Sequence, residues 1–253
     1  MPRKARKKSS SGIYHIMLRG INRQLIFEDD EDKSRFLETL KKYKEISKYQ
    51  LYSYCLMDNH IHLLLKESEE GVSEIIKRIS SSYVYWYNLK YERCGHLFQD
   101  RFKSENVENS AYFLTVLRYI HQNPIKAGLE KTIFESKWTS IDEYIGKMKI
   151  VDIDFGLNLL SADRSQAIKL FIEYMPQTND DQCLDDMVKV TRSDSEVLQH
   201  LYKLGITNKS QLQQMDKKNR DATLIMLKKL NGVTVKQLSR ITGISKSTIY
   251  RLR

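Results

Sequence analysis

The sequence predicts an α+β fold with an antiparallel sheet, followed by an all-α region. Strand-like and helix-like segments alternate over the first half of the chain, in the order strand, helix, strand, strand, helix, strand, helix. The two middle strands are separated only by a short turn around Asp58-Asn59, which favours an antiparallel pair. From Asp163 onward the chain is almost free of strand signals, which indicates helices.

The elements of the first half follow from the spacing of apolar residues. Strands are predicted at 13–18, 51–56 and 60–66 and within 98–107, and helices at 36–46, 72–91 and 110–123. The last helix is expected to stop at Pro124, because a proline disfavours helical geometry in the residue before it. The first six elements follow the split β-α-β order of ferredoxin-like folds, in which the helices lie on one face of the sheet.

The second half is expected to end in a helix-turn-helix at about 219–253. Helices are predicted at 164–174, 193–204, 210–215, 219–230 and 235–243, with Gly243 closing the last of these. Leu238, Ile241, Ile244 and Ile249 would pack the two terminal helices together. The residues then left to face a DNA groove are Lys246, Ser247, Thr248, Tyr250 and Arg251. A helical hairpin without a role in DNA binding is the alternative.

Composition narrows the class of partner and the compartment. The 253 residues carry a formal net charge of +10, which favours a polyanionic partner, nucleic acid first. The three cysteines form no CxxC pair, so neither a zinc cluster nor a disulfide framework is expected, and free thiols fit a reducing cytoplasm. No apolar run is long enough to cross a membrane. We expect a cytoplasmic protein with a mobile basic arm at 1–12, a catalytic domain at 13–140 and a helical DNA-binding region at 141–253.

Two histidines, His60 and His62, stand in an apolar stretch of the third predicted strand. Side chains two residues apart in a strand point to the same face, so the two imidazoles lie side by side and Ile61 points to the other face. Such a pair can bind a metal ion. Two histidines at the edge of a strand, without a ligand, are an equally good interpretation of the triplet alone.

The helix predicted at 110–123 brings a tyrosine and an amide together. Tyr119 and Asn123 are four residues apart, so they share a face at its last turn. If this helix packs beside the histidine strand, the amide oxygen of Asn123 becomes a third ligand for Mg²⁺ or Mn²⁺, and Tyr119 lies near the ion. The phenol could then attack a metal-polarised phosphate. From the helix alone, Tyr119 is more readily explained as one of 15 tyrosines that pack in the core.

Four segments together resemble the single-tyrosine HUH transposases, most closely the REP-associated tyrosine transposases. They are RGINRQLIF at 19–27, MDNHIHLL at 57–64, GHLFQDRF at 95–102 and RYIHQNPIKAGL at 118–129. The resemblance covers residues 13–140 and implies the HUH endonuclease fold, with His60 and His62 as metal ligands, Tyr119 as the nucleophile and Asn123 completing the metal site. It also implies a single-stranded or hairpin DNA substrate, a 5′-phosphotyrosine and a 3′-hydroxyl, and leaves open a monomer or a homodimer that exchanges the tyrosine helix.

Other basic residues and histidines receive weaker assignments. Phosphate contacts are expected for Arg19, Arg23, Arg101 and Lys103. His15 is interpreted as a core or surface histidine and His121 as structural or facing DNA, and no general base is evident. Two further functions stay open, namely a replication initiator or relaxase of the HUH class, and a domesticated DNA-binding regulator whose transposase fold serves as a scaffold. Duplex DNA is the expected partner of the helix-turn-helix.

Overall fold

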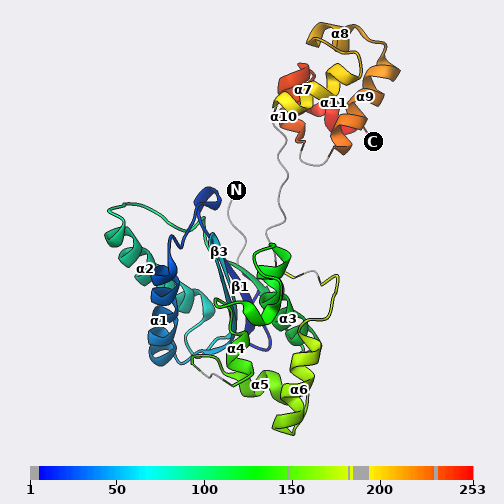
Figure 1. Ribbon diagram of the computed structural model, residues 1–253. Coiled ribbons are helices and arrows are strands. Elements are labelled where there is room, and N and C mark those ends of the chain that lie inside the picture. The colour runs from blue at the N-terminus through cyan, green and yellow to red at the C-terminus, as the bar shows by residue number, and fades with distance from the viewer. Residues whose placement is uncertain (1–5, 147–148, 182, 185–193, 231–232, 253) are drawn as a thin grey trace. The chain divides into compact units, whose positions relative to one another are not determined.

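The computed structural model describes residues 6–146, 149–181, 183–184, 194–230 and 233–252 (Figure 1). The chain divides into two compact units, residues 1–185 and residues 186–253. Each unit has a hydrophobic core of its own. None of the helices in the described ranges is long and apolar enough to span a bilayer.

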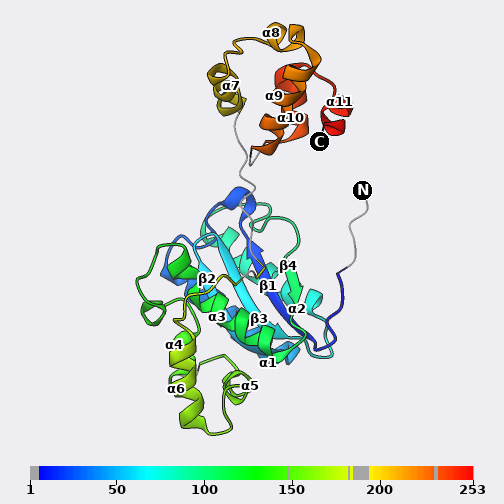
Figure 2. The ribbon, with the colours of Figure 1, turned by 90° about the vertical axis from the view of Figure 1, so that its right-hand side faces the viewer.

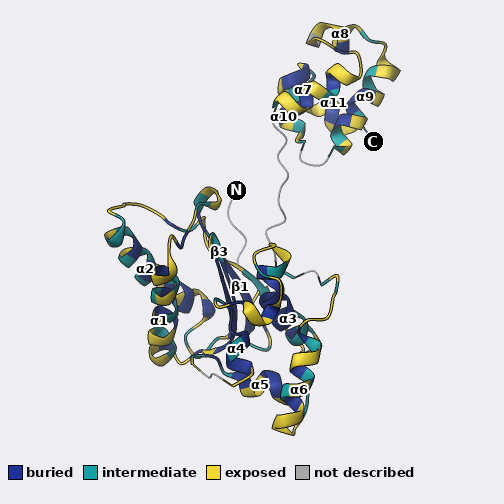
Figure 3. Ribbon diagram, in the orientation of Figure 1, coloured by how far each residue is buried: buried dark blue, intermediate teal, exposed yellow. Residues whose placement is uncertain are grey.

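The sheet of the first unit has four antiparallel strands in the order β2-β3-β1-β4. They are β1 (Ile13–Arg19), β2 (Gln50–Met57), β3 (His60–Lys66) and β4 (Lys103–Asn106). The first six elements therefore have the predicted ferredoxin-like order, and the predicted fold class is confirmed. The central strands β1 and β3 are almost completely buried, which fits their near-continuous apolar sequence (Figure 3).

Helices lie on both sides of this sheet (Figures 1 and 2). On one side α1 (Asp30–Ser47) and α2 (Val72–Lys90) pack against each other, and on the other side α3 (Ser110–Lys126) packs against β2 and β3. A capping box of Asp29 and Asp32 fixes the start of α1, because each side chain accepts a hydrogen bond from the backbone N–H of the other. Asn109 caps α3 in a similar way and so fixes the start of the helix that carries Tyr119.

Helix α3 does not end at Pro124, so the predicted stop is wrong. The helix continues to Lys126, because the fixed backbone angle of proline is compatible with a helix and costs only one hydrogen bond in the last turn. The N–H groups of Ala127 and Leu129 bond to the carbonyls of Asn123 and Pro124, at 3.0 and 2.9 Å, and so complete the end of the helix. Both Tyr119 and Asn123 consequently lie inside a regular, buried stretch of helix.

The first unit extends beyond residue 140, where the sequence suggested a boundary. Three short helices follow that point: α4 (Ile141–Tyr144), α5 (Ile153–Asn158) and α6 (Arg164–Tyr174). Two 3-10 turns, η1 (Ile21–Arg23) and η2 (Ile133–Glu135), lie earlier in the chain. The ring of Tyr144 stacks on that of Phe171 at 4.5 Å, and its hydroxyl donates to the carbonyl of Tyr52. These contacts attach α4 and α6 to the core of the sheet, and the chain divides only after residue 185.

The basic arm is only partly described, since residues 1–5 lie outside the described ranges. The residues that follow contact the first unit, and the mobility of the arm stays a prediction. The N–H of Ser9 donates to the Tyr14 hydroxyl at 2.9 Å, and the N–H of Ser10 donates to Glu108 at 3.0 Å. Arg6 donates to the carbonyl of Phe102 at 2.6 Å. From Arg6 onward the arm therefore lies along the edge strand β4.

The second unit contains the helices α7 (Asp194–Lys203), α8 (Lys209–Gln214), α9 (Lys217–Lys229), α10 (Val235–Thr242) and α11 (Lys246–Arg251). Gly243 ends α10 at a φ of 74°, a left-handed conformation that glycine adopts without strain, and a β-carbon there would meet Gln213 at 2.6 Å. Ser245 caps α11. Residue Ser193 of a predicted helix lies outside the described ranges.

Candidate active site

The register of the sheet gathers titratable side chains on the face that α3 covers. His15 is opposite Glu105, and Arg19 is opposite His60. His62 is opposite Met17, whose other neighbour across the sheet is Lys103. Because paired residues of adjacent strands project from the same face, these side chains form three neighbouring rows beneath α3, which we call the histidine rows. The predicted side-by-side arrangement of His60 and His62 is present, with ring centroids 5.1 Å apart.

His62 is completely buried and bonds to a second histidine. Its Nδ1 lies 2.9 Å from Nε2 of His15, which is also completely buried. The Nδ1 of His15 lies 3.8 Å from a carboxylate oxygen of Glu105. Contact with His15, together with other hydrogen bonds, lowers the pKa of Glu105. An ionised Glu105 favours a proton on His15 Nδ1, so His15 Nε2 accepts and His62 Nδ1 donates.

This chain of contacts determines the state of His62. Burial, reinforced by the nearby charges of His15, His60 and Arg19, lowers the pKa of His62 well below its ordinary value, so the ring is neutral. With Nδ1 donating to His15, the lone pair of the ring is on Nε2. That atom is buried and has no hydrogen-bond partner in the described structure. A buried nitrogen lone pair without a partner is costly unless a ligand satisfies it, and a metal ion is a suitable ligand.

His60 has the same tautomer for a different reason. Its Nδ1 lies 2.6 Å from the amide oxygen of Asn59, which can only accept, so His60 Nδ1 donates. The amide nitrogen of Asn59 donates in turn to the carbonyl of Arg23 at 3.4 Å. Both histidines therefore carry their lone pair on Nε2, which is the arrangement that two metal-binding imidazoles need.

Tyr119 packs directly against this histidine cluster. Its ring centroid is 5.8 Å from that of His62 and 5.8 Å from that of His15, in edge-on arrangements. The ammonium group of Lys126 lies over the tyrosine ring, 4.8 Å from its centroid. Tyr119 is only 4% exposed. The structure thus brings the predicted nucleophile to the predicted metal ligands across α3 and β3, elements that are far apart in the sequence.

Asn123 follows one turn after Tyr119, and its amide nitrogen donates to the Tyr119 carbonyl at 3.0 Å. The amide oxygen is thereby the atom left to act as a ligand. Among the residues that the structure describes, no three His, Cys, Asp or Glu side chains are grouped to hold a metal ion. A third protein ligand would therefore come from another residue type, and the direct approach of Asn123 to the two histidines stays a prediction.

The predicted DNA-binding residues fall into separate places. Arg19 and Lys103 lie in the histidine rows, and the Arg23 side chain is exposed beside the turn that carries Asn59. Arg101 is exposed in the segment before β4, where it lines a cavity. In the second unit Ile249 is buried, and the predicted groove-facing residues of α11 are all exposed: Lys246, Ser247, Thr248, Tyr250 and Arg251. A role of α11 in DNA binding remains a prediction.

Sequence reasoning missed three residues of this site. The sequence pattern indicates His15 only as a core or surface histidine, and it does not mark Glu105 or Lys126. The register of β1 could have revealed His15, because it alternates with Met17 and Arg19 on one strand face. His121 is structural, since it is buried and lies 2.9 Å from the Ser140 hydroxyl.

Comparisons with known proteins bear on the family and the fold of the chain. Residues 8–123 match the family described as IS200-like transposases, which confirms the resemblance to single-tyrosine transposases. A REP-associated tyrosine transposase bound to a REP hairpin has the same fold, with a TM-score of 0.52 and 16% identity over 61% of this chain and 90% of that chain. A proposed transposase from Deinococcus radiodurans covers 48% of this chain and 97% of its own, with 16% identity and a TM-score of 0.35. No curated protein sequence matches the chain.

Proposed function

We propose that this protein is a transposase that cuts and rejoins single-stranded or hairpin DNA through a 5′-phosphotyrosine on Tyr119. The observation that carries the proposal is the packing of the Tyr119 ring against His62, whose buried Nε2 has no hydrogen-bond partner among the residues that the structure describes. The contact of Lys126 with the Tyr119 ring alone is compatible with a purely structural tyrosine. The neutral His62 imidazole beside that ring has a free lone pair that can bind a metal ion, and a metal ion supports phosphate chemistry.

The reaction exchanges a phosphodiester bond of the DNA for a phosphotyrosine ester, and this ester conserves the energy of the broken bond. The phenolic oxygen of Tyr119 attacks the scissile phosphorus, its proton passes to water, and the bond from phosphorus to the 3′-oxygen breaks. The leaving strand ends in a 3′-hydroxyl after it takes a proton from water, and the 5′-phosphate remains on the tyrosine. Attack of a 3′-hydroxyl on this ester reverses the step, so rejoining needs no nucleotide cofactor.

His60, His62 and Asn123 are the proposed ligands of a divalent cation. A bound Mg²⁺ or Mn²⁺ would polarise the scissile phosphate and stabilise the charge that develops on it, and nitrogen ligands favour Mn²⁺ over Mg²⁺. His15 and Asn59 keep the two histidines in the binding tautomer. The ammonium group of Lys126 lies close enough to the Tyr119 ring to favour a phosphate brought to it. Because Tyr119 is nearly covered, DNA binding must expose its hydroxyl.

The remaining predicted contacts serve to hold the DNA. Arg19 and Lys103 lie in the histidine rows and are proposed to contact phosphates next to the cut. The exposed face of α11 is proposed to contact duplex DNA, in the manner of a helix-turn-helix.

A labelled hairpin with single-stranded flanks tests the proposal. With Mn²⁺ or Mg²⁺, the protein should form a covalent adduct with one DNA fragment and release the other with a 3′-hydroxyl. Tyr119→Phe should form none, whereas Tyr85→Phe, which changes an exposed tyrosine of α2, should react normally. Tight DNA binding without any adduct, across a varied set of hairpins, would instead favour a DNA-binding regulator.

A further inference from the structure

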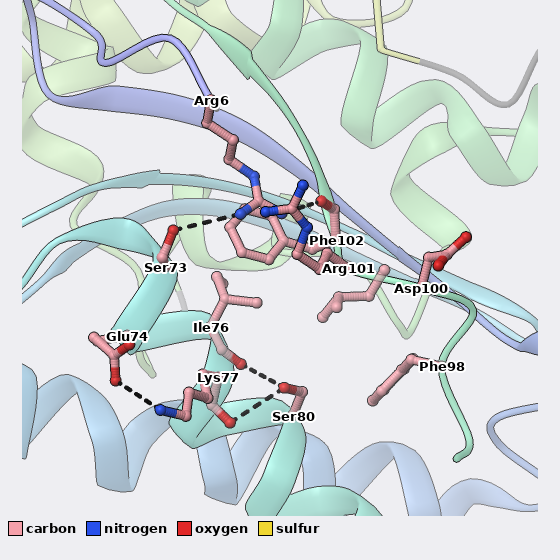
Figure 4. Close-up of a pocket in the computed structure, with 11 residues that line it drawn as sticks. Arg6, Ser73, Glu74, Ile76, Lys77, Ser80, Phe98, Asp100, Arg101 and Phe102 are labelled. Carbon is pink, nitrogen blue, oxygen red and sulfur yellow. Dashed lines mark hydrogen bonds and ion pairs between the residues drawn. The ribbon is translucent and has the colours of Figure 1, made fainter. Parts of the chain in front are cut away.

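A second candidate binding site lies at the edge of the sheet, between α2 and the segment that leads into β4 (Figure 4). It is a cavity of about 370 Å³, within the usual range of ~300–1,000 Å³ for small-ligand sites. Its apolar side is formed by Leu18, Ile76, Phe98 and Phe102. A second hollow, of about 480 Å³, shares Phe102 and reaches β4.

The apolar side of the cavity contains two half-buried aromatic rings. Phe98 and Phe102 are each partly exposed, although Leu18 and Ile76 beside them are buried. The guanidinium of Arg6 stands over the Phe102 ring, 3.5 Å from its centroid. Flat aromatic surfaces of this kind bind nucleobases irrespective of sequence, because each base has a π-face.

Cations gather at the same place. Arg6 and Arg101 both line the cavity, and burial together with the charge of Arg101 lowers the pKa of Arg6. Two guanidinium groups that repel each other are stabilised by an anion between them. Of the other charged groups in the lining, Lys77 is paired with Glu74 at 3.2 Å, and Asp100 contributes one carboxylate. A ligand that combines a flat apolar ring with an anionic group fits this lining best.

The cavity is connected to the histidine site through β4. Lys103, the first residue of that strand, lines the second hollow and belongs to the row of Met17 and His62. The cavity lies on the side of the sheet that faces α2, whereas the histidines lie under α3. A DNA strand that contacts both places would therefore pass around the edge strand β4, where the second hollow lies.

We propose that this cavity binds one unpaired nucleotide of the DNA that is cut at the histidine site. The base contacts Phe98 and Phe102, and the adjoining phosphate is held by Arg6 and Arg101. This inference rests on the proposed function, because it assigns the cavity to the same substrate. In this proposal the described part of the basic arm supplies Arg6 to the nucleotide site.

The test measures binding without chemistry. A fluorescent hairpin with oligothymidine flanks is titrated with the full chain in EDTA, and each flanking nucleotide in turn is replaced by an abasic one. In the unaltered protein, one position should lose about tenfold in affinity, as expected for a single stacked base. In the Phe102→Ala protein, the abasic nucleotide at that position should cause no further loss of affinity. Phe134→Ala, which removes an exposed ring outside the cavity, should keep the tenfold effect.

An exposed residue provides a second variant that does not depend on the packing of Phe102. Arg101→Ala should reduce the slope of log affinity against log salt by about 0.7, the value for one lost phosphate contact on a single strand. An equal abasic penalty in the unaltered protein and in Phe102→Ala, or an unchanged salt slope, would overturn the inference. If the Tyr119 adduct nevertheless forms, the proposed function stands. If the abasic effect is present but no adduct forms, the proposed function fails and the nucleotide site stands.

Discussion

The two faces of the central sheet are made by the same strands, yet they differ in chemistry. Under α1 and α2 the alternating residues are apolar, such as Ile16, Leu18 and Ile61. Under α3 the neighbouring positions are His15, His62 and Glu105. Burying the two imidazoles completely costs free energy that apolar residues would not cost. The apolar face under α1 and α2 therefore stabilises the fold, whereas the buried histidines under α3 are better explained by a role in function.

The largest expected effect is a difference in adduct formation between variants of two adjacent residues of β3, His62 and Ile61. His62→Ala should reduce the rate of adduct formation by at least about 100-fold, because it removes a proposed metal ligand. Ile61→Ala should lower the free energy of unfolding by about 2–5 kcal/mol, because it leaves a cavity, while the folded protein still forms the adduct. Adduct assays and urea denaturation of both variants make the comparison.

The metal assignment within this contrast has its own control. EDTA should abolish the adduct of the unaltered protein, and added Mn²⁺ should restore it. If the His62→Ala protein forms the adduct at the normal rate, the functional difference between the two sheet faces is contradicted.

A smaller effect is expected at the contact between His15 and His62. His15→Ala should weaken Mn²⁺ binding by about 10- to 100-fold, the usual loss when the partner of a ligating histidine is removed. His15→Gln should recover part of it, because its amide oxygen can accept the hydrogen bond from His62 Nδ1. Electron paramagnetic resonance of free Mn²⁺ measures the affinity without relying on activity. Equal affinities for all three proteins would show that His15 only packs.

Asn123 should have an effect of about tenfold on Mn²⁺ affinity, since it supplies one neutral oxygen. Asn123→Ala removes that oxygen together with the hydrogen bond to the Tyr119 carbonyl, whereas Asn123→Asp keeps an oxygen ligand and loses only the bond. The same titration should therefore find weak binding in the first variant and near-normal binding in the second. Equal weakening in both would assign the effect to the helix rather than to the metal.

The smallest expected effect concerns α11, where a substitution should change the affinity for duplex DNA but not the rate of adduct formation. Arg251→Ala should weaken binding of duplex DNA a few-fold and reduce the salt slope by about one, as for one phosphate contact. The adduct rate at saturating hairpin should not change. Lys229→Ala, at an exposed cation of α9, is the matched control. Identical salt slopes for the two variants, measured by fluorescence anisotropy, would remove the proposed role of α11.

Local patterns in the sequence predicted the elements well. The alternation around His60 and the helical spacing around Tyr119 are properties of single segments, and both are present in the structure. The boundary at residue 185 could not be predicted, because it depends on the packing of Tyr144 and Phe171 onto the sheet. The continuation of α3 past Pro124 was missed because proline only disfavours a helix locally.

The candidate site could be predicted only in part, because it depends on contacts between segments that are far apart in the sequence. The resemblance to transposases joined His60, His62 and Tyr119, which no local pattern could join. The roles of His15 and Glu105 depend on the register of β1 with β3 and β4, which is set by non-local hydrogen bonds. The docking of Arg6 on Phe102 joins residues almost a hundred positions apart, so composition could only indicate a basic arm.

The most direct measurement is the mapping of the covalent bond between protein and DNA. After incubation of the unaltered protein with a flanked hairpin and Mn²⁺, proteolysis and mass spectrometry identify the peptide that carries the nucleotide. The account predicts a phosphotyrosine ester on the peptide that contains Tyr119, with the 5′ end of the DNA attached. A DNA adduct on any other residue, or cleavage that leaves no covalent intermediate, would contradict it.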